Sequence, residues 1–281
     1  MKFVLTANVA MCLLIGGVAL SAAPAAVAQQ QSGQEIGSSK YLYLSTEAIK
    51  PGMEDSVIQN ESSQVQALRE ANSPVHYIGL VGITGTPRAV FLAGFNSFAE
   101  MQKEHEQMMS NTKLNDTLKA DNTTESPMLG GVMDSIYEYR EDLSLRAQHD
   151  LSQMRFRDIT IFHVRNGHRQ DFERLAKLYA KAYSSDPDAN WTMFEKDYGP
   201  GSGAVFIGIT PLKSLAGVDQ EMLDGENLPK SIGADQMQLL RQLGAASLES
   251  AESDLYAVVP QMSYVPDSWV KASPDFWGKK Q

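Results

Sequence analysis

The sequence predicts an α+β fold made of two βαββαβ units in tandem. The chain has 281 residues, of which 43% are hydrophobic and 21% are charged, so it is long and apolar enough to bury one core or two small ones. A shift of 115 positions places Ala89-Val90-Phe91 on an identical Ala204-Val205-Phe206, and Gly52 on Gly167. Hydrophobic periodicity then gives the same order of elements in both halves.

The first unit is assigned to residues 40–145. Alternating apolar residues and Gly/Pro breaks predict strands over 40–46, 75–81, 89–95 and 132–140, with one helix over 53–71 and another beginning at Ser97. Gly85-Thr86-Pro87 indicates a hairpin turn between the two middle strands. Ser97 and Glu100 have capping-box spacing, which supports a helix start there.

The second unit is assigned to residues 146–265. The same patterns predict strands over 156–164, 191–198, 204–209 and 255–259, with a helix over 168–183 and another over 234–249. A further helix is expected to begin at Thr210, because Thr is a favoured cap and Pro211 suits the first helical position. The alternative is two unrelated α+β domains whose strands look alike because Val, Ile and Phe are common in strands.

The chain ends carry separate signals. Residues 1–28 have the pattern of a signal peptide: Lys2, an apolar run over 9–20 and an Ala-Val-Ala cleavage site before Gln29. The run is shorter than the ~20 residues that a membrane span needs. Residues 29–39 are expected to form a flexible leader and residues 266–281 a C-terminal tail. We therefore expect an exported protein, periplasmic or secreted, with no membrane span after cleavage.

Composition excludes several classes of function. The net charge of −10 disfavours binding to nucleic acid or anionic lipid, because phosphate binding needs clustered Lys and Arg. Cleavage would remove Cys12, the only cysteine, and with it disulfides, thiolate nucleophiles and Cys-ligated metals. The five histidines show no recognised metal spacing. The sequence therefore predicts no metal site and no cofactor.

Two βαββαβ units in tandem resemble ferredoxin-like modules. The arrangement, over about residues 40–265, resembles the dimeric α/β-barrel superfamily, which includes the antibiotic-biosynthesis monooxygenase, EthD and NIPSNAP families. The resemblance implies that the sheets of the two units pack face to face and leave a ligand cleft. It also implies a monomer that acts as a pseudo-dimer, because both units lie in one chain.

Strand alternation separates two faces on the first strand of each unit. Leu42 and Leu44 share the aliphatic face of one strand, as Ile159 and Ile161 do in the other. We assign these faces to the helices, so that the aromatic and polar faces point into the space between the sheets. The predicted ligand-binding residues are Tyr43, His76, Asp158, Trp191 and Glu195. Alternatively, these aromatic side chains fill a solid core.

Three functions remain open at this point. The first is binding of an unidentified small molecule in an internal cleft between the units. The second is a monooxygenase-like oxidoreductase, either cofactor-independent with Asp158 as the base or haem-dependent with His105 as the ligand, since some haem-handling members of the superfamily use a helix histidine. The third is a structural scaffold without a ligand.

Overall fold

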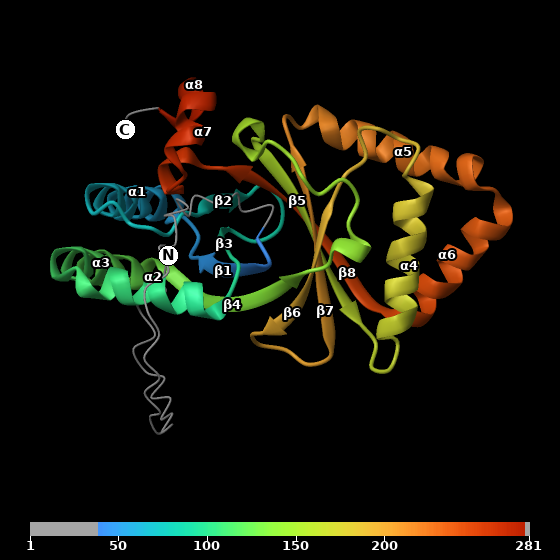
Figure 1. The fold of residues 1–281 in the computed structure, drawn as a ribbon, viewed down its shortest axis with the longest axis horizontal. Helices are drawn as coiled ribbons and strands as arrows, with labels where there is room; N and C mark the ends of the chain where they lie inside the picture. Colours follow the sequence, from blue (N-terminus) through green and yellow to red (C-terminus); the bar gives the residue numbers. More distant parts are fainter. Residues whose placement is uncertain (1–38, 279–281) are drawn as a thin grey trace, which may run out of the picture.

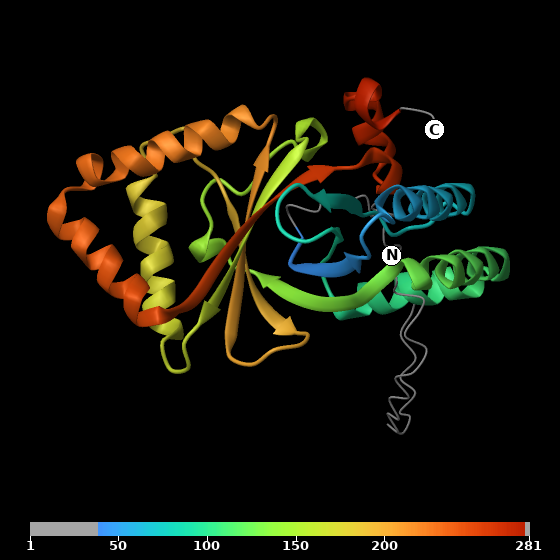
Figure 2. The same cartoon turned by 180° about the vertical axis from the view of Figure 1, so that it is seen from behind.

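Eight antiparallel strands close into one barrel in the computed structural model, which describes residues 39–278 (Figure 1). The strand order around the barrel is β1-β3-β2-β8-β5-β7-β6-β4. Helices α1, α2 and α3 lie at one end and α4, α5 and α6 at the other, and the strands lie between them in both views (Figures 1 and 2). The predicted signal peptide and all but the last residue of the leader lie outside the described residues.

The first unit has the predicted order with one additional helix. Its elements are β1 (Tyr41–Ile49), α1 (Glu54–Glu70), β2 (Ile78–Gly82), β3 (Arg88–Phe95), α2 (Phe98–Ser110), α3 (Thr112–Glu125) and β4 (Leu129–Tyr139). The capping box is confirmed, because the Ser97 hydroxyl accepts a hydrogen bond from the backbone N–H of Glu100 at 3.1 Å. The sequence did not reveal α3, because Asn115, Asn122 and Glu125 are among the residues that it buries.

The second unit repeats this order. Its elements are β5 (Phe156–Val164), α4 (Arg169–Ala182), β6 (Thr192–Tyr198), β7 (Ala204–Leu212), α5 (Ala216–Ile232), α6 (Ala234–Ser247) and β8 (Leu248–Val258). The helix predicted to begin at Thr210 is wrong. Thr210 and Pro211 belong to β7, where they pair with Asp158 and Arg157, and the helix begins at Ala216. Ladder pairing with β5 outweighs the local capping signal.

The two units share one barrel. Within the first unit the strands run β2-β3-β1-β4, and within the second they run β8-β5-β7-β6. β2 pairs with β8 and β4 pairs with β6, so each edge of one sheet is joined to an edge of the other. The predicted fold class, two ferredoxin-like units in an intrachain α/β barrel, is confirmed.

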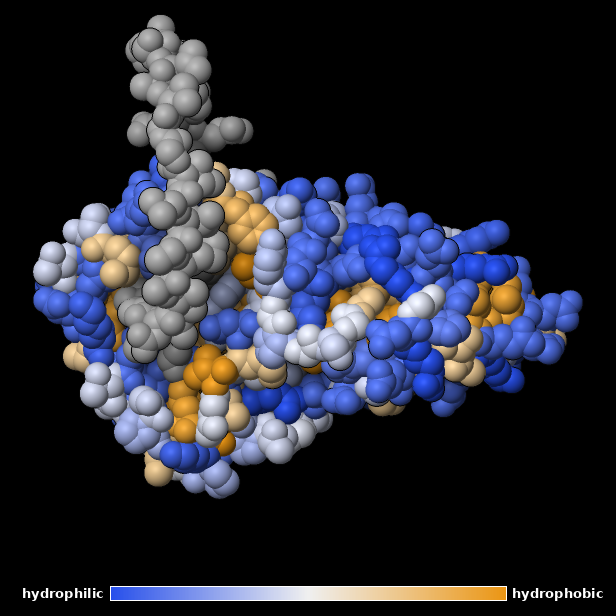
Figure 3. All heavy atoms as spheres, turned by 90° about the horizontal axis from the view of Figure 1, so that it is seen from below, coloured by the Kyte–Doolittle hydropathy of each residue, from blue (hydrophilic) through white to orange (hydrophobic). Residues whose placement is uncertain are grey.

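Short elements complete the fold. Within residues 39–278, 3-10 turns lie at Ser126–Met128, Glu141–Leu143, Leu151–Gln153 and Pro260–Met262. In the predicted tail, α7 (Asp267–Ala272) and α8 (Pro274–Trp277) pack Trp269 and Trp277 into the core, and the Trp277 indole donates to the Ser152 carbonyl at 2.8 Å. Among the described helices, none has the length and apolar character of a membrane span. Figure 3 shows a largely hydrophilic face with small, separate apolar patches.

The predicted assignment of the strand faces is wrong. Leu42 and Ile159 belong to the core inside the barrel, whereas Tyr43 packs in the core beneath the helices of the first unit. The interior of an eight-stranded barrel is just wide enough for side chains to fill it, and here mostly aliphatic residues do so. The outer face, between the strands and the helices, carries Tyr43 and other aromatic side chains, while the interior also holds Tyr137 and Phe194.

Candidate functional site

A cavity of about 410 Å³ lies in the second unit, between the outer face of the sheet and helices α4 and α6. This corrects the prediction of a cleft between the two units, because the space found inside the barrel measures only about 30 Å³. The lining is mainly aromatic and aliphatic: Phe162, Phe172, Leu175, Ala176, Tyr179, Tyr183, Trp191, Met193, Leu240 and Leu248. Its polar side chains, besides the two tyrosine hydroxyls, are Thr160, Thr210 and Arg241.

Two glycines keep this cavity open. Gly208 lies on β7 between its partners Thr160 on β5 and Met193 on β6, so it forms the floor of the cavity. Gly244 lies on α6, and a Cβ there would meet Leu175 at 3.9 Å. Because both positions lack a side chain, sheet and helix are separated by a space that neighbouring side chains do not fill.

The aromatic walls are held in place by contacts with one another and with residues behind them. The Trp191 indole donates to the backbone carbonyl of Leu143 at 2.9 Å, and its ring meets Tyr183 edge-on at 6.0 Å between centroids. Phe172 packs against Phe162 at 5.3 Å and against Phe206 at 4.5 Å. These contacts fix the shape of the cavity before any ligand arrives.

The polar groups of the cavity are mostly hydrogen-bond donors. Burial raises the pKa of Tyr179 and of Tyr183, so both hydroxyls stay protonated at neutral pH. Arg241 is the one cationic side chain among the described lining residues, and it makes no ion pair with another described residue. The cavity therefore suits a ligand with an apolar ring and an oxygen-bearing or anionic end.

Two carboxyl groups lie near residues that line the cavity. Asp158 lies on β5 beside Thr160, whose hydroxyl donates to Asp158 Oδ1 at 3.4 Å, and burial raises the pKa of Asp158. Burial, then the charges of Asp158 and Asp224, raise the pKa of Glu221 on α5 to about 7. Glu221 also acts on the pKa of Tyr183, which lines the cavity. Sequence reasoning missed Glu221, because only the fold brings α5 to the end of β5.

Glu195 has a different environment. It accepts from Arg140 Nη1 at 2.6 Å and from Arg169 Nε at 2.6 Å. Burial alone would raise the pKa of Glu195, but these two arginines lower it, so the carboxylate stays ionised. Glu195 is thus a member of an ion network at the edge of the second unit, and that network also contains Glu173 and Asp142.

The remaining predicted residues lie in the first unit. Tyr43 is buried on β1, where burial and then Asp134 raise its pKa. His76 stacks on Tyr264 at 4.8 Å between ring centroids, and burial lowers the pKa of its imidazole. Of the five predicted ligand-binding residues, the structure therefore places Trp191 in the cavity wall and Asp158 near residues that line it, and it does not bring Tyr43 or His76 to them.

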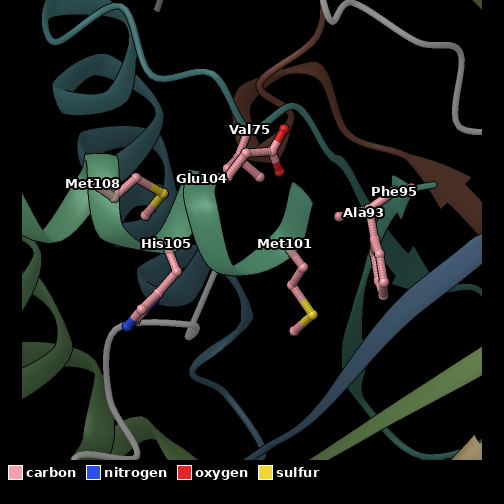
Figure 4. A pocket seen from close by; sticks show the side chains of 8 residues that line it. Val75, Ala93, Phe95, Met101, Glu104, His105 and Met108 are labelled. Atoms are coloured by element: carbon pink, nitrogen blue, oxygen red, sulfur yellow. The ribbon is translucent and has the colours of Figure 1, made fainter. Parts of the chain in front are cut away.

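His105 lies on α2 beside a recess of about 20 Å³, with Met101, Met108 and Phe95 among its lining residues. Figure 4 shows Glu104 turned toward Val75, while the imidazole of His105 points to another side of the helix. A recess of this volume holds about one water molecule. The surroundings of His105 therefore do not fit a haem group, and the lining of the large cavity contains no histidine among the described residues.

Glu104 gives a testable pH dependence. Burial, with the charge of Glu100 and against that of Lys103, raises its pKa from 4.5 to about 7. Because the folded state binds this proton more tightly than the unfolded state, the carboxyl group destabilises the fold increasingly as the pH rises from 4.5 to about 7, and not below. We expect Glu104→Gln to match the wild type in acid and to be more stable above about pH 7. Urea denaturation of the wild type and of Glu104→Gln, in acid and above about pH 7, measures the difference in their free energies of unfolding. A variant no more stable than the wild type above about pH 7 would contradict the prediction.

A buried acidic cluster occupies the corresponding space in the first unit. Glu47 on β1, Glu61 on α1 and Glu125 on α3 are each at most 1% exposed, and carboxylate oxygens from all three lie within 4.8 Å of one another. Burial and the nearby charges of Glu125 and Glu47 raise the pKa of Glu61. Oxygen donors in this number suit a hard divalent cation, so these residues could hold a metal ion. The sequence hid this group, because its members lie far apart along the chain.

One solved structure supports the fold, and two others resemble it more weakly. No protein-family model matches the sequence, and no curated protein matches it significantly. A solved structure described as an anthrone oxidase-like protein has a TM-score of 0.52 and 11% identity, over 79% of this chain and 93% of that one. A provisionally named monooxygenase from Lactobacillus acidophilus NCFM has a TM-score of 0.48 and 9% identity, over 81% of this chain and 100% of that one. A mutant chlorite dismutase from Candidatus Nitrospira defluvii has a TM-score of 0.45 and 12% identity, over 80% of this chain and 93% of that one. At these identities the similarity concerns the fold alone.

Proposed function

We propose that this protein binds a small aromatic molecule in the cavity between β5, β6, β7 and helices α4 and α6. The observation that carries the proposal is the cavity itself: about 410 Å³, largely apolar, with a few polar groups. Ligand sites typically enclose ~300–1,000 Å³ and have this mixture of lining residues. A solid scaffold, the third function considered from the sequence, would not leave such a space.

The lining supports an aromatic ligand with an acidic or hydroxyl group. Tyr179, Tyr183 and Trp191 provide ring faces and edges for an apolar ring. Arg241 supplies a positive charge to a chain whose net charge is −10, so it offers a local partner for a carboxylate or phenolate. Thr160 and Thr210 offer hydroxyl groups on the sheet side of the cavity.

A second candidate function is oxidation of the bound molecule, with dioxygen as the acceptor of its electrons. Asp158 and Glu221 favour it, because half-buried carboxyl groups with raised pKa values near a ligand cavity can take a proton from a phenol or an activated carbon. The structure described as anthrone oxidase-like belongs to the same fold, which makes an oxidoreductase the chemistry to test first. In this candidate Asp158 acts as the base, as considered from the sequence. Export of the protein remains a proposal that depends on residues 1–28.

The test uses 1-naphthoate and its uncharged counterpart 1-naphthamide, with isothermal titration calorimetry on the purified chain. We expect both compounds to bind saturably and to quench the fluorescence of Trp191. Arg241→Gln should weaken the binding of 1-naphthoate about tenfold, the equivalent of ~1.4 kcal/mol, and leave 1-naphthamide unaffected. Absence of saturable binding by either compound, together with native mass spectra that show no retained small molecule, would refute the binding function.

The oxidation candidate has its own readout. Oxygen consumption with a bound phenol, lost in Asp158→Asn while binding persists, would support it. Binding without oxygen consumption in the wild type would leave a binding protein.

A further inference from the structure

Arg157 is a buried cation inside the barrel. It lies on β5, where alternation turns its side chain to the same interior face as Ile159, and it is 2% exposed. Its Nη1 donates to the backbone carbonyl of Phe156 at 2.8 Å. Its Nη2 is buried and has no hydrogen-bond partner. A guanidinium donor is thus left unsatisfied in the interior, where an unpaired polar group is costly.

No described carboxylate compensates the charge of Arg157. It forms no ion pair within residues 39–278, and the charged group that acts on it is another cation, Arg155. Burial, followed by the charge of Arg155, lowers the pKa of Arg157 to about 9, so the side chain still carries its charge at neutral pH. Buried charges in proteins are ordinarily paired. Arg157 is therefore a buried, unpaired cation that a bound anion would stabilise.

A small space lies beside this guanidinium. It measures about 30 Å³ and is lined by Arg157, Thr192 and apolar side chains from both units, including Leu42 and Phe194. Ala147 and Leu151, from the segment between β4 and β5, also line it. The neighbouring His149 has a buried Nε2 without a hydrogen-bond partner, and its pKa is lowered by burial and by the charge of Arg157. Of the residues that line this space, Arg157 and Thr192 carry polar side chains, and they come from two different strands, β5 and β6.

We propose that a single halide-sized anion, chloride in a chloride-containing medium, binds at Nη2 of Arg157 inside the barrel. The hydroxyl of Thr192 is a second donor to it. The space exceeds the ~10–15 Å³ that one water molecule requires but is an order of magnitude smaller than an organic ligand site. The anion would neutralise Arg157 and join the segment between β4 and β5 to strands of both units. This site is separate from the cavity in the second unit and does not depend on its function.

Thermal unfolding at constant ionic strength tests the proposal. Chloride or bromide is exchanged for gluconate, which is too large for the space. A ligand that binds only the folded state at ~10 times its dissociation constant raises the ratio of folded to unfolded protein about tenfold. We expect the melting temperature of the wild type to rise with halide concentration and to saturate. Arg157→Gln should remove this dependence. The matched control is Arg165→Gln, because Arg165 is exposed just beyond the end of β5. This variant should keep the halide dependence of the melting temperature.

A crystal grown in bromide gives a second, direct measurement. We expect an anomalous peak within hydrogen-bond distance of Arg157 Nη2. If Arg157→Gln does not fold, the halide dependence of the wild type and the bromide peak still decide the question. A melting temperature of the wild type that is the same in halide and gluconate, with no anomalous peak at Arg157, would overturn the proposal and leave water at the site.

Discussion

Gly208→Phe is expected to weaken the binding of 1-naphthoate at least ~100-fold, which corresponds to ~2.7 kcal/mol. A Cβ built on Gly208 lies 3.5 Å from Phe162 Cε2 and 3.7 Å from Met193 Cε, which are ordinary contacts, so the backbone accepts a side chain here. Since Gly208 lines the cavity, the added ring would occupy the space that the ligand needs. Calorimetric titration of wild type and variant measures the difference.

The control for this substitution is Gly131→Phe. Gly131 also lies on a strand, β4, but it is exposed, and a Cβ there meets nothing within 4 Å. We expect this variant to bind 1-naphthoate as the wild type does. Gly208→Phe should have the same melting temperature as the wild type, because the new ring fills an apolar space rather than displacing packed atoms. Undiminished binding by a folded Gly208→Phe would show that the ligand lies elsewhere.

Arg140→Leu is expected to lower the free energy of unfolding by roughly 2–4 kcal/mol. Arg140 contacts Asp142 at 2.9 Å, Glu173 at 2.8 Å and Glu195 at 2.6 Å, and the side chains of Arg140, Glu173 and Glu195 are 15–17% exposed. Without the guanidinium of Arg140, several carboxylates would lie close together with less positive charge to offset their repulsion. The effect is smaller than for a fully buried pair, because water reaches the network and Arg169 still contacts Glu195 at 2.6 Å.

Urea denaturation of matched variants measures this effect. Arg174→Leu, at an exposed position on α4, should change the free energy of unfolding by less than ~0.5 kcal/mol. In the Arg140→Leu background, Glu195→Gln should recover part of the loss, because it removes one of the carboxylates left behind. Equal stability of Arg140→Leu and Arg174→Leu would show that the network contributes little.

The sequence was sufficient for the order of the elements but not for the direction of the strand faces. Period-two alternation separated Leu42 and Leu44 from Tyr43 correctly, because it depends on the backbone alone. Which face enters the barrel depends on closure of the sheet, and closure depends on pairings between strands far apart in sequence, such as β2 with β8. Reversing the faces moved Tyr43 and Asp158 from the expected space between the sheets to the space under the helices.

The repeat contained a signal about the site that periodicity did not use. The same shift of 115 positions places Gly208 opposite Ala93 and Phe162 opposite Glu47. In the second unit the glycine opens the cavity and the phenylalanine lines it, whereas in the first unit Glu47 belongs to the acidic cluster. Differences between the copies, more than their identities, thus mark where each unit has its own chemistry. The acidic cluster itself needed the fold, since α3 was not predicted.

Each half of this chain provides hydrogen-bonding partners for the edge strands of the other half. The pairings of β2 with β8 and β4 with β6 satisfy backbone groups that a separated half would expose along two bare strand edges. Such edges template self-association, so a severed half would be driven to find a second copy of itself or to aggregate. Covalent linkage of the halves makes this partnership independent of protein concentration. It also allows the two halves to diverge, because one closed ring of strands no longer has to be assembled from identical parts.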